Sequence, residues 1–577
     1  MVAIRLQNFG GMIPAVDAKL LPENASSNAV NAWMPEGKLT GLRVPRQIYT
    51  LQNVGTRSVF RIPKAQPDVV HIEDSWWLEF LAANTTCVPN PNSAPGSIDP
   101  GYYFADGVNP VGYTTLSRVS AGDPNLVLGI PNPTVAPTLS IAGGSGSPEA
   151  RAYIYTWVSA YGEEGPPSPA SIVTTGLNDA TWTVGLTVPS GGEMANRDLV
   201  STNIYRTVTN VQGVATYFFV ANVSIATTTY ADSALSVDIV NNNELTSLLY
   251  TAPTLLQGLV TMPNGILVGW IRNDLWFSQP FLPHAWPASY QISVPYPIVG
   301  LAVYGQTLCV LTEGLPYQCT GSDPSVMTLA QIPFPYPCTS QGSIVTSASG
   351  IYYAAPNGIA LITPGGGGLA TTKLLTKEKW QKYLTVRSLN AALIGSMYYT
   401  FSGVGEGCFE PTAFENSAFE TEDFTGTKNG ALIDLTDQRI AMSLLQYATP
   451  TYNVLTDVWT DEVLIIQNGM VLMVDITDAA VPGNYSWRSK IFQLPKIGNL
   501  GACKIFYVLP PGVDNPSATL TVYADGINRA VITLPTSGQM FRLPTGFTAD
   551  TYQFEIDGNL WIQNVQIASS PKELATV

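Results

Sequence analysis

The stretch Asn264–Trp270, NGILVGW, opens a loose internal repeat in which a glycine-led turn precedes apolar strand sequence. Four similar turns follow within residues 254–490, led by Gly305, Gly350, Gly395 and Gly469. The five leading glycines lie 40, 45, 45 and 74 residues apart, and one propeller blade occupies about 40–50 residues. The spacing predicts the main blades of a β-propeller over 254–490, with an insertion in the last interval.

Residues 131–253, ahead of the repeat, have the short alternating strands of a sandwich and lie between Pro- and Gly-rich linkers. The stretch Ser159–Ser171, SAYGEEGPPSPAS, resembles fibronectin type III modules, in which an aromatic strand precedes a turn rich in Glu, Gly and Pro. Strand-turn-strand sequence also fills residues 58–130. We therefore expect 58–130 to hold the first propeller strands and 131–253 to be a fibronectin III/Ig-like insert.

The two ends of the chain have patterns of their own. Residues 1–57 look like an irregular platform segment, with a helix expected over Leu21–Ala32 and a strand over Val44–Leu51. Residues 491–577 alternate between apolar and polar side chains around a hairpin turn at Asp525-Gly526, which predicts a C-terminal β-sandwich region. With one more helix over Thr376–Leu384, the predicted fold class is all-β, with helix below about 12%.

Composition excludes several classes of protein. The 577 residues carry 27 Lys and Arg against 42 Asp and Glu, a net charge of −15, and only 12% are charged. Disordered chains have the opposite balance of charge and hydrophobicity, and an acidic chain lacks the clustered bases that grip nucleic acid. The chain contains no run of 18 apolar residues, so no membrane-spanning helix is expected. The first residues lack the features of a signal peptide, so we expect synthesis in a cytoplasm.

Residues capable of catalysis are sparse. The chain has two histidines, His71 and His284, and no nucleophile, phosphate-loop or metal-binding motif. Val59–Pro63 contains the FRIP sequence of sialidases, in which the arginine, here Arg61, would hold a substrate carboxylate. The Asp-box repeats that accompany this sequence in sialidases are missing, so we expect Arg61 to be an ordinary strand residue. We predict no enzyme activity and no cofactor or metal.

The six cysteines are at positions 87, 309, 319, 338, 408 and 503, without a CxxC pair. Buried free thiols are the simpler interpretation. A disulfide between Cys309 and Cys319 is the local alternative, and the sequence leaves it open.

An acidic segment, 406–424, lies in the long last interval of the repeat. It lacks the order of carboxylates in a calcium loop, and phenylalanines recur every five residues, which suits a surface pressed against another subunit. The segment is predicted to lie at an inter-subunit seam or in a channel lumen. Its candidate interface or lumen residues are Glu406, Glu410, Glu415, Glu420, Glu422, Asp423, Phe409, Phe414, Phe419 and Phe424.

Both ends of the chain resemble the nozzle proteins, or tail tubular protein B, of short-tailed, podovirus-type bacteriophages. The resemblance rests on the following stretches: Phe9–Asp17, Leu20–Ala25, Ala29–Ala32, Gly37–Leu39, Leu42-Arg43, Phe541–Phe547, Tyr552–Ile556, Val565–Ala568 and Glu573-Leu574. It implies a structural virion protein of the tail, made in the host cytoplasm.

This family implies a homohexamer below the tail adaptor ring, which extends the DNA exit channel and carries tail fibres or spikes. Genomic DNA would pass through without specific binding, and acidic walls would repel its phosphates. The alternative function is a carbohydrate-binding or sialidase-like propeller acting on cell-surface glycans. A secreted adhesin with a fibronectin-like module is a third class, which the missing signal peptide disfavours.

Overall fold

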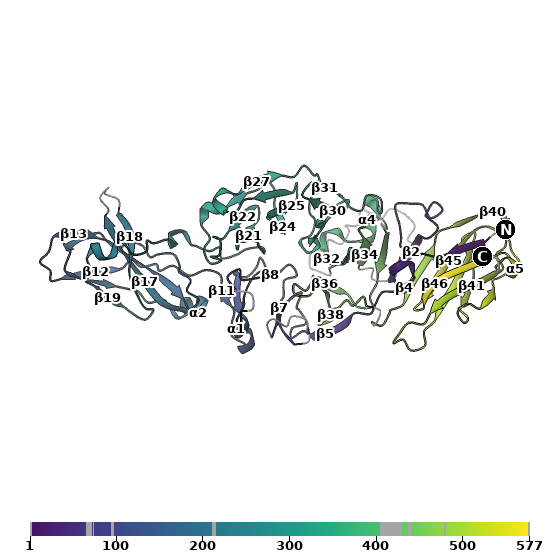
Figure 1. Ribbon diagram of the computed structural model, residues 1–577, viewed down its shortest axis with the longest axis horizontal. Coiled ribbons are helices and arrows are strands. Elements are labelled where there is room, and N and C mark those ends of the chain that lie inside the picture. The colour runs from purple at the N-terminus through teal and green to yellow at the C-terminus, as the bar shows by residue number, and fades with distance from the viewer. Residues whose placement is uncertain are drawn as a thin grey trace, which may run out of the picture. The chain divides into compact units, whose positions relative to one another are not determined.

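A computed structural model describes residues 3–64, 72, 74–93, 97–209, 215–403, 430–436, 441–477 and 480–574 (Figure 1). The fold is all-β, as predicted, with 9% helix and 47% strand. The chain forms two compact units, one of Met1–Ala83, Leu311–Pro316 and Ile332–Val577 and the other of Asn84–Val310 and Tyr317–Gln331. Among the described residues, no helix combines the length and apolarity needed to cross a lipid bilayer.

The second unit contains two antiparallel sheets of four short strands on either side of the predicted insert. The first has the order β11-β10-β9-β8 and the second the order β20-β21-β22-β23. Their bounds are β8 Thr86–Pro89, β9 Gly101–Ala105, β10 Gly112–Thr115, β11 Leu126–Val127, β20 Leu259–Thr261, β21 Leu267–Ile271, β22 Asp274–Phe277 and β23 Ile292–Ser293, with helix α1 at Leu116–Ala121.

A further four-stranded sheet follows directly in the chain. Its strands are β24 Ile298–Tyr304, β25 Thr307–Thr312, β26 Tyr317–Thr320 and β27 Thr328–Gln331, paired in chain order.

Between β11 and β20 the chain builds a sandwich with a core of its own. Two three-stranded sheets, β12-β16-β19 and β14-β17-β18, and the pair β13-β15 enclose Tyr153, Trp157 and Trp182. The bounds are β12 Thr138–Ala142, β13 Pro148–Arg151, β14 Tyr153–Ser159, β15 Thr174–Leu177, β16 Thr181–Gly185, β17 Leu199–Thr209, β18 Ala215–Ser224 and β19 Thr229–Asp232, with helices α2 Gly191–Arg197 and α3 Ser236–Ile239.

The first unit contains four more successive groups of antiparallel strands. They are β28 Val345–Ser347, β29 Gly350–Ala355, β30 Gly358–Thr363 and β31 Gly366–Leu369; β32 Leu389–Ile394, β33 Met397–Ser402, β34 Gly430–Asp434 and β35 Ala441–Leu445; β36 Thr451–Thr456, β37 Val463–Gln467 and β38 Met470–Met473; and the hairpin of β6 Ser58–Pro63 and β7 Ser75–Phe80. The group β36-β37-β38 takes its fourth strand, β5 at Arg46–Thr50, from near the other end of the chain.

The glycines of the sequence repeat lie at hairpin turns. Gly265, Gly305, Gly350 and Gly395 each lie at the turn, or at the first residue after it, between the first two strands of a sheet. Gly469 instead lies between the second and third strands of its group, with φ of 74° after Asn468 with φ of 45°. Both residues have the positive φ of a type I′ hairpin turn. The shift by one strand contributes to the length of the last interval.

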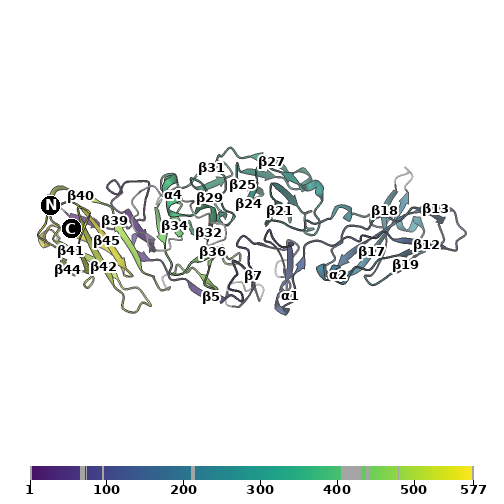
Figure 2. The same cartoon turned by 180° about the vertical axis from the view of Figure 1, so that it is seen from behind.

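The C-terminal strands and the first strands of the chain together form a two-sheet module. One sheet has the order β1-β46-β41-β44. The other has ten strands: the group β32-β33-β34-β35 continues through β2-β39-β45-β42-β43, with β40 paired to β45. The bounds are β1 Ala3–Leu6, β2 Ser26–Val30, β39 Tyr485–Ser489, β40 Phe492–Gly498, β41 Ala502–Val508, β42 Ala518–Ala524, β43 Ile527–Thr533, β44 Met540–Arg542, β45 Ala549–Gly558 and β46 Trp561–Ala568, with helix α5 at Pro571–Leu574. Figures 1 and 2 show both chain ends beside β41 and β45.

Three local predictions can now be assessed. The helix expected over Leu21–Ala32 is wrong: β2 pairs Ala29 with Trp487 of β39, so tertiary strand pairing overrides a weak helix signal. The other expected helix is confirmed as α4, Lys377–Tyr383, capped by Thr376. β39 precedes residue 491, so the C-terminal sheet begins earlier than predicted, and residues 1–57 supply it with strands rather than forming an irregular segment.

Candidate functional site

The ten interface or lumen candidates predicted from the sequence lie within 404–429, outside the described residues. Cys408 lies in the same range, and His71 is also outside the described residues. The structure therefore places none of them. The described part of the chain contains no group of three or more His, Cys, Asp or Glu side chains that could hold a metal ion.

Arg61, the arginine of the FRIP sequence, is buried in an ion pair. It lies on β6 and is 2% exposed. Its guanidinium donates from Nε and Nη2 to the two carboxylate oxygens of Asp457, at 3.0 and 2.6 Å, and from Nη1 to Ser75 Oγ at 3.2 Å. The Trp459 indole donates to the Arg61 carbonyl at 2.8 Å. A guanidinium engaged in this way is part of the core and presents no open site for a substrate carboxylate.

Cys309 and Cys319 are free, buried thiols. Cys319 is paired across the sheet with Leu308, the residue before Cys309. Because side chains alternate between faces along a strand, the two thiols point to opposite faces of the sheet. Burial raises the pKa of each thiol to about 11, which makes both unreactive near neutral pH. The disulfide left open by the sequence is excluded by this register.

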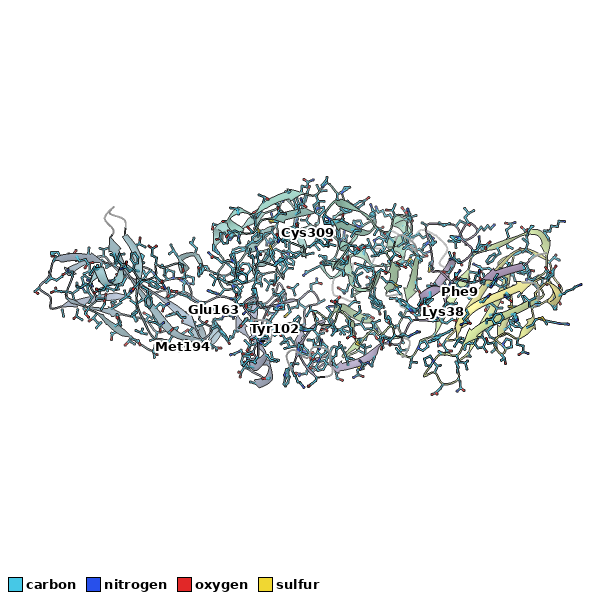
Figure 3. The ribbon with its side chains drawn as sticks, viewed as in Figure 1. Phe9, Lys38, Tyr102, Glu163, Met194 and Cys309 are labelled. Atoms are coloured by element: carbon cyan, nitrogen blue, oxygen red, sulfur yellow. The ribbon has the colours of Figure 1, made fainter. Side chains whose placement is uncertain are left out.

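A cavity of about 830 Å³ lies in the first unit, beside the Phe-Gly-Gly sequence at Phe9–Gly11. Its walls come from 8–13, 22–25, the 3₁₀ turn η1 at Pro35–Gly37 with the preceding 32–34, the turn at 396–397, and strands β34 and β35. Figure 3 shows Phe9 and Lys38 close together in this part of the molecule. Ala32 and Trp33 form strand β3, Ala32–Trp33, which pairs with β4, Thr40–Gly41.

Close backbone contacts hold the Phe-Gly-Gly sequence in place. Phe9 packs edge-on against Trp487, with ring centroids 5.0 Å apart, and the Trp487 indole donates to the Gly10 carbonyl at 3.0 Å. Met12 and Met442 exchange two backbone hydrogen bonds of 2.8 and 3.0 Å. A Cβ on Gly11 would lie 2.7 Å from the Met442 carbonyl oxygen. Only glycine fits this position without movement of the backbone.

The charged groups at the cavity are acidic. Glu36 and Asp434 line it, and the Lys38 ammonium lies 3.3 Å from Glu36. Asp434 accepts hydrogen bonds from the backbone N–H and the hydroxyl of Thr436, at 2.9 and 2.8 Å. Three methionines also line the walls, Met34, Met397 and Met442. Among the described residues, the lining contains no histidine or cysteine.

A second concentration of charge joins the sandwich to the sheet of β9 and β10 within the second unit. Arg197, at the end of α2, is fully buried and donates from Nε and Nη2 to both carboxylate oxygens of Glu163, at 2.7 Å each. Nη2 also donates to the Tyr103 hydroxyl at 3.1 Å, and the guanidinium lies 4.0 Å from the ring centre of Tyr113. Figure 3 labels Glu163 here, with Met194 of α2 nearby.

His284 lies against this ion pair, with Nδ1 3.8 Å from a Glu163 carboxylate oxygen. Burial lowers the pKa of His284, which keeps the imidazole neutral near pH 7. Burial alone would raise the pKa of Glu163, but the Arg197 charge and hydrogen bonds outweigh it and lower that pKa. The Arg197 and Glu163 charges neutralise each other within the cluster.

The buried ion pairs could not be predicted from the sequence. Glu163 lies in a stretch typical of a turn, and nothing in the sequence marks Arg197, which comes from a separate helix, as its partner. The same holds for Arg151 and Arg206, both 0% exposed, which share Asp232 inside the sandwich at 3.6 and 3.5 Å. Because the chain has two histidines and few charged residues, its arginines were the remaining residues in the sequence that could have pointed to buried charge.

No protein-family model and no curated protein matches the chain. Solved structures give only faint likenesses. The N-terminal domain of Nup159 is 11% identical, over 38% of this chain and 76% of that chain, with a TM-score of 0.18. AztD from Citrobacter koseri is 11% identical, over 46% and 67%, with a TM-score of 0.16. An exo-beta-1,3-galactanase from Phanerochaete chrysosporium is 7% identical, over 73% and 100%, with a TM-score of 0.18. Similarities this low identify neither the fold family nor the function of the chain.

Proposed function

We propose that this chain is a structural subunit of the tail nozzle of a short-tailed bacteriophage. Six copies would form a ring that extends the DNA exit channel below the adaptor and carries fibres or spikes. The proposal begins from the sequence resemblance at the two chain ends. The observation that carries it furthest is that these motifs, far apart in sequence, meet in one module. Ala29 and Ile556 pair with Trp487 of β39 from its two sides, and Phe9, Leu39, Leu543 and Val565 belong to one hydrophobic cluster.

The proposed core of the subunit is a β-propeller. Seven successive antiparallel groups support it: β6–β7, β8–β11, β20–β23, β24–β27, β28–β31, β32–β35 and β36–β38 with β5. The last group is completed by a strand from near the other end of the chain, an arrangement by which a ring of blades can be closed. The sandwich of β12–β19 would then be an insert between two blades.

The chemistry of the described residues supports a structural role over the sialidase-like alternative. Arg61 is held by Asp457 and Ser75 rather than open to a substrate. The described lining of the cavity at Phe9–Gly11 carries Glu36 and Asp434 but no histidine or cysteine. A net charge of −15 suits a conduit through which DNA passes without binding.

Mass and shape of the purified full-length protein test the proposal. Native mass spectrometry is expected to give a species of six times the 61.8 kDa chain mass, and negative-stain images a six-fold ring with a central opening. The same preparation should release no sugar from sialylated or other cell-surface glycans. A protein that stays monomeric at every concentration, or that hydrolyses glycans, contradicts the proposal.

A further inference from the structure

Both sheets of the C-terminal module end on the same side, at β43 and β44. β43 is the last strand of one sheet and β44 the last strand of the other. The short segment 534–539 crosses between them and is anchored on β41, because Gly538 N–H donates to the Ile505 carbonyl at 2.8 Å and the Tyr507 hydroxyl to the Pro535 carbonyl at 3.0 Å. We call β43 and β44 together the open edge.

The register shows which backbone groups of β43 face outward. Leu534 N–H donates to the Ala518 carbonyl at 3.0 Å, so these two residues form a hydrogen-bonded pair, and such pairs alternate along antiparallel strands. Thr533 and Val531, opposite Thr519 and Thr521, are therefore non-hydrogen-bonded positions. Their N–H and C=O groups point away from β42. No described residue is recorded as a hydrogen-bond partner for them.

The same reasoning applies to β44. Leu543 N–H donates to the Gly501 carbonyl at 3.0 Å, and the pairing then alternates through Arg542 and Met540. The backbone groups of Met540 and Arg542 face outward, again without a recorded partner among the described residues. The open edge thus offers two short rows of unpaired donors and acceptors.

Two other long edge strands, β14 and β18, are covered. Along β14, Gly165, Ser168 and Ser171 donate backbone hydrogen bonds of 2.8–3.0 Å to the strand. Along β18, the segment 242–245 accepts from Phe219 and donates to Tyr217. Proteins protect edge strands in this way because an uncovered edge pairs with other chains. Along the open edge, a β-bulge between Val522 and Tyr523 of β42 interrupts the pairing with β43, and 530–533 form a regular segment.

The side chains of the open edge suit a strand of opposite charge. Ile527, Val531 and Met540 are 54%, 60% and 45% exposed, so apolar surface is available beside the free backbone groups. Arg529 and Arg542, both exposed, are the charged residues of β43 and β44, and neither strand has an acid. A second copy of this chain carries 42 Asp and Glu against 27 Lys and Arg. Two copies with a net charge of −15 repel overall, but an acidic stretch of one copy is complementary in charge to the basic open edge of another.

We infer that the open edge docks a strand edge on the neighbouring copy of this chain, an inference that rests on the proposed ring. A ring needs a heterologous contact, in which two different surfaces of the same protein meet. Backbone pairing along β43 and β44 sets the direction and register of that contact, and Arg529 and Arg542 face acidic side chains of the neighbour.

Val531→Pro tests the inference with little change to the subunit. Proline removes one outward N–H but no β42–β43 hydrogen bond, and proline is tolerated on edge strands at such positions. Val531→Lys is the second variant, because it keeps the backbone and adds a charge that discourages edge pairing. Val531→Thr is the matched control, which retains the donor and the strand propensity. Circular dichroism and thermal unfolding check that each variant is folded.

Native mass spectrometry of the full-length proteins then measures assembly. We expect Val531→Pro and Val531→Lys to weaken ring formation at least about tenfold in concentration, and Val531→Thr to assemble nearly as the wild type. If the wild type forms rings and both variants form them equally well, the open edge is not the contact, whereas the ring proposal stands. A wild type that remains monomeric at every concentration overturns both. Should Val531→Pro fail to fold, Val531→Lys decides the matter alone.

Discussion

Replacing Arg61 by methionine tests whether this arginine holds the first unit together. The change keeps the side-chain length but leaves the Asp457 carboxylate, whose side chain is 2% exposed, without its cation. The Thr460 N–H and hydroxyl still donate to this carboxylate, at 3.2 and 2.7 Å. Breaking one side of such a pair costs about 3–5 kcal/mol. At 1.4 kcal/mol per factor of ten, local opening becomes roughly a hundred to a few thousand times more frequent.

Hydrogen exchange followed by mass spectrometry measures this opening in peptides that cover β6, β36 and β37. The double variant Arg61→Met, Asp457→Leu is the control, because removing both charges is nearly neutral when the site stays packed. Its exchange should therefore return most of the way to the wild-type rate. Exchange in Arg61→Met that matches the wild type would refute the structural role, and so would a sialidase activity that this variant abolishes.

Three further outcomes are expected. The pKa of His284 is lowered in the folded protein, so as pH falls the unfolded chain binds a proton at this residue before the folded chain does. The second unit should therefore lose stability as pH falls below the ordinary value of about 6.5. In thermal melts, the melting temperature of His284→Gln should fall less over this pH range. Gly11→Ala should destabilise the first unit by about 1–3 kcal/mol in urea unfolding, whereas Gly365→Ala, with open space around its Cβ, should change little. Mild oxidation should produce no Cys309–Cys319 disulfide in peptide maps, since the thiols lie on opposite faces; a linked peptide would contradict the register.

Local signals predicted the strands well. The glycine-led turns and the Asp525-Gly526 hairpin, with φ of 48° and 75°, follow from backbone chemistry that a few neighbouring residues determine. The same is true of α4, which Thr376 caps. All these features depend on contacts within a few residues.

Predictions failed where distant segments decide the structure. β2 is a strand because β39, more than 400 residues later, pairs with it. Arg197 is buried because Glu163 reaches it from another turn, and Arg61 because Asp457 lies beside it. No periodicity in the sequence reports such partners. The acidic segment, in contrast, was identified by composition alone and lies outside the described residues, so its role stays a prediction.

The pairing of the first strands with the last ones constrains the order of folding. Ala3 pairs with Ala568, and β5 can pair only after β38 has been synthesised. At about 5–20 residues per second, a ribosome needs roughly half a minute to two minutes to supply β46 after β1 has emerged. During that time β1, β2 and β5 have no native partners, whereas the sandwich at β12–β19 makes its contacts locally and is expected to fold early. High contact order of this kind slows folding, so the N-terminal strands are the segments most exposed to chaperones, and to mispairing with other nascent chains, before the C-terminal sheet is complete.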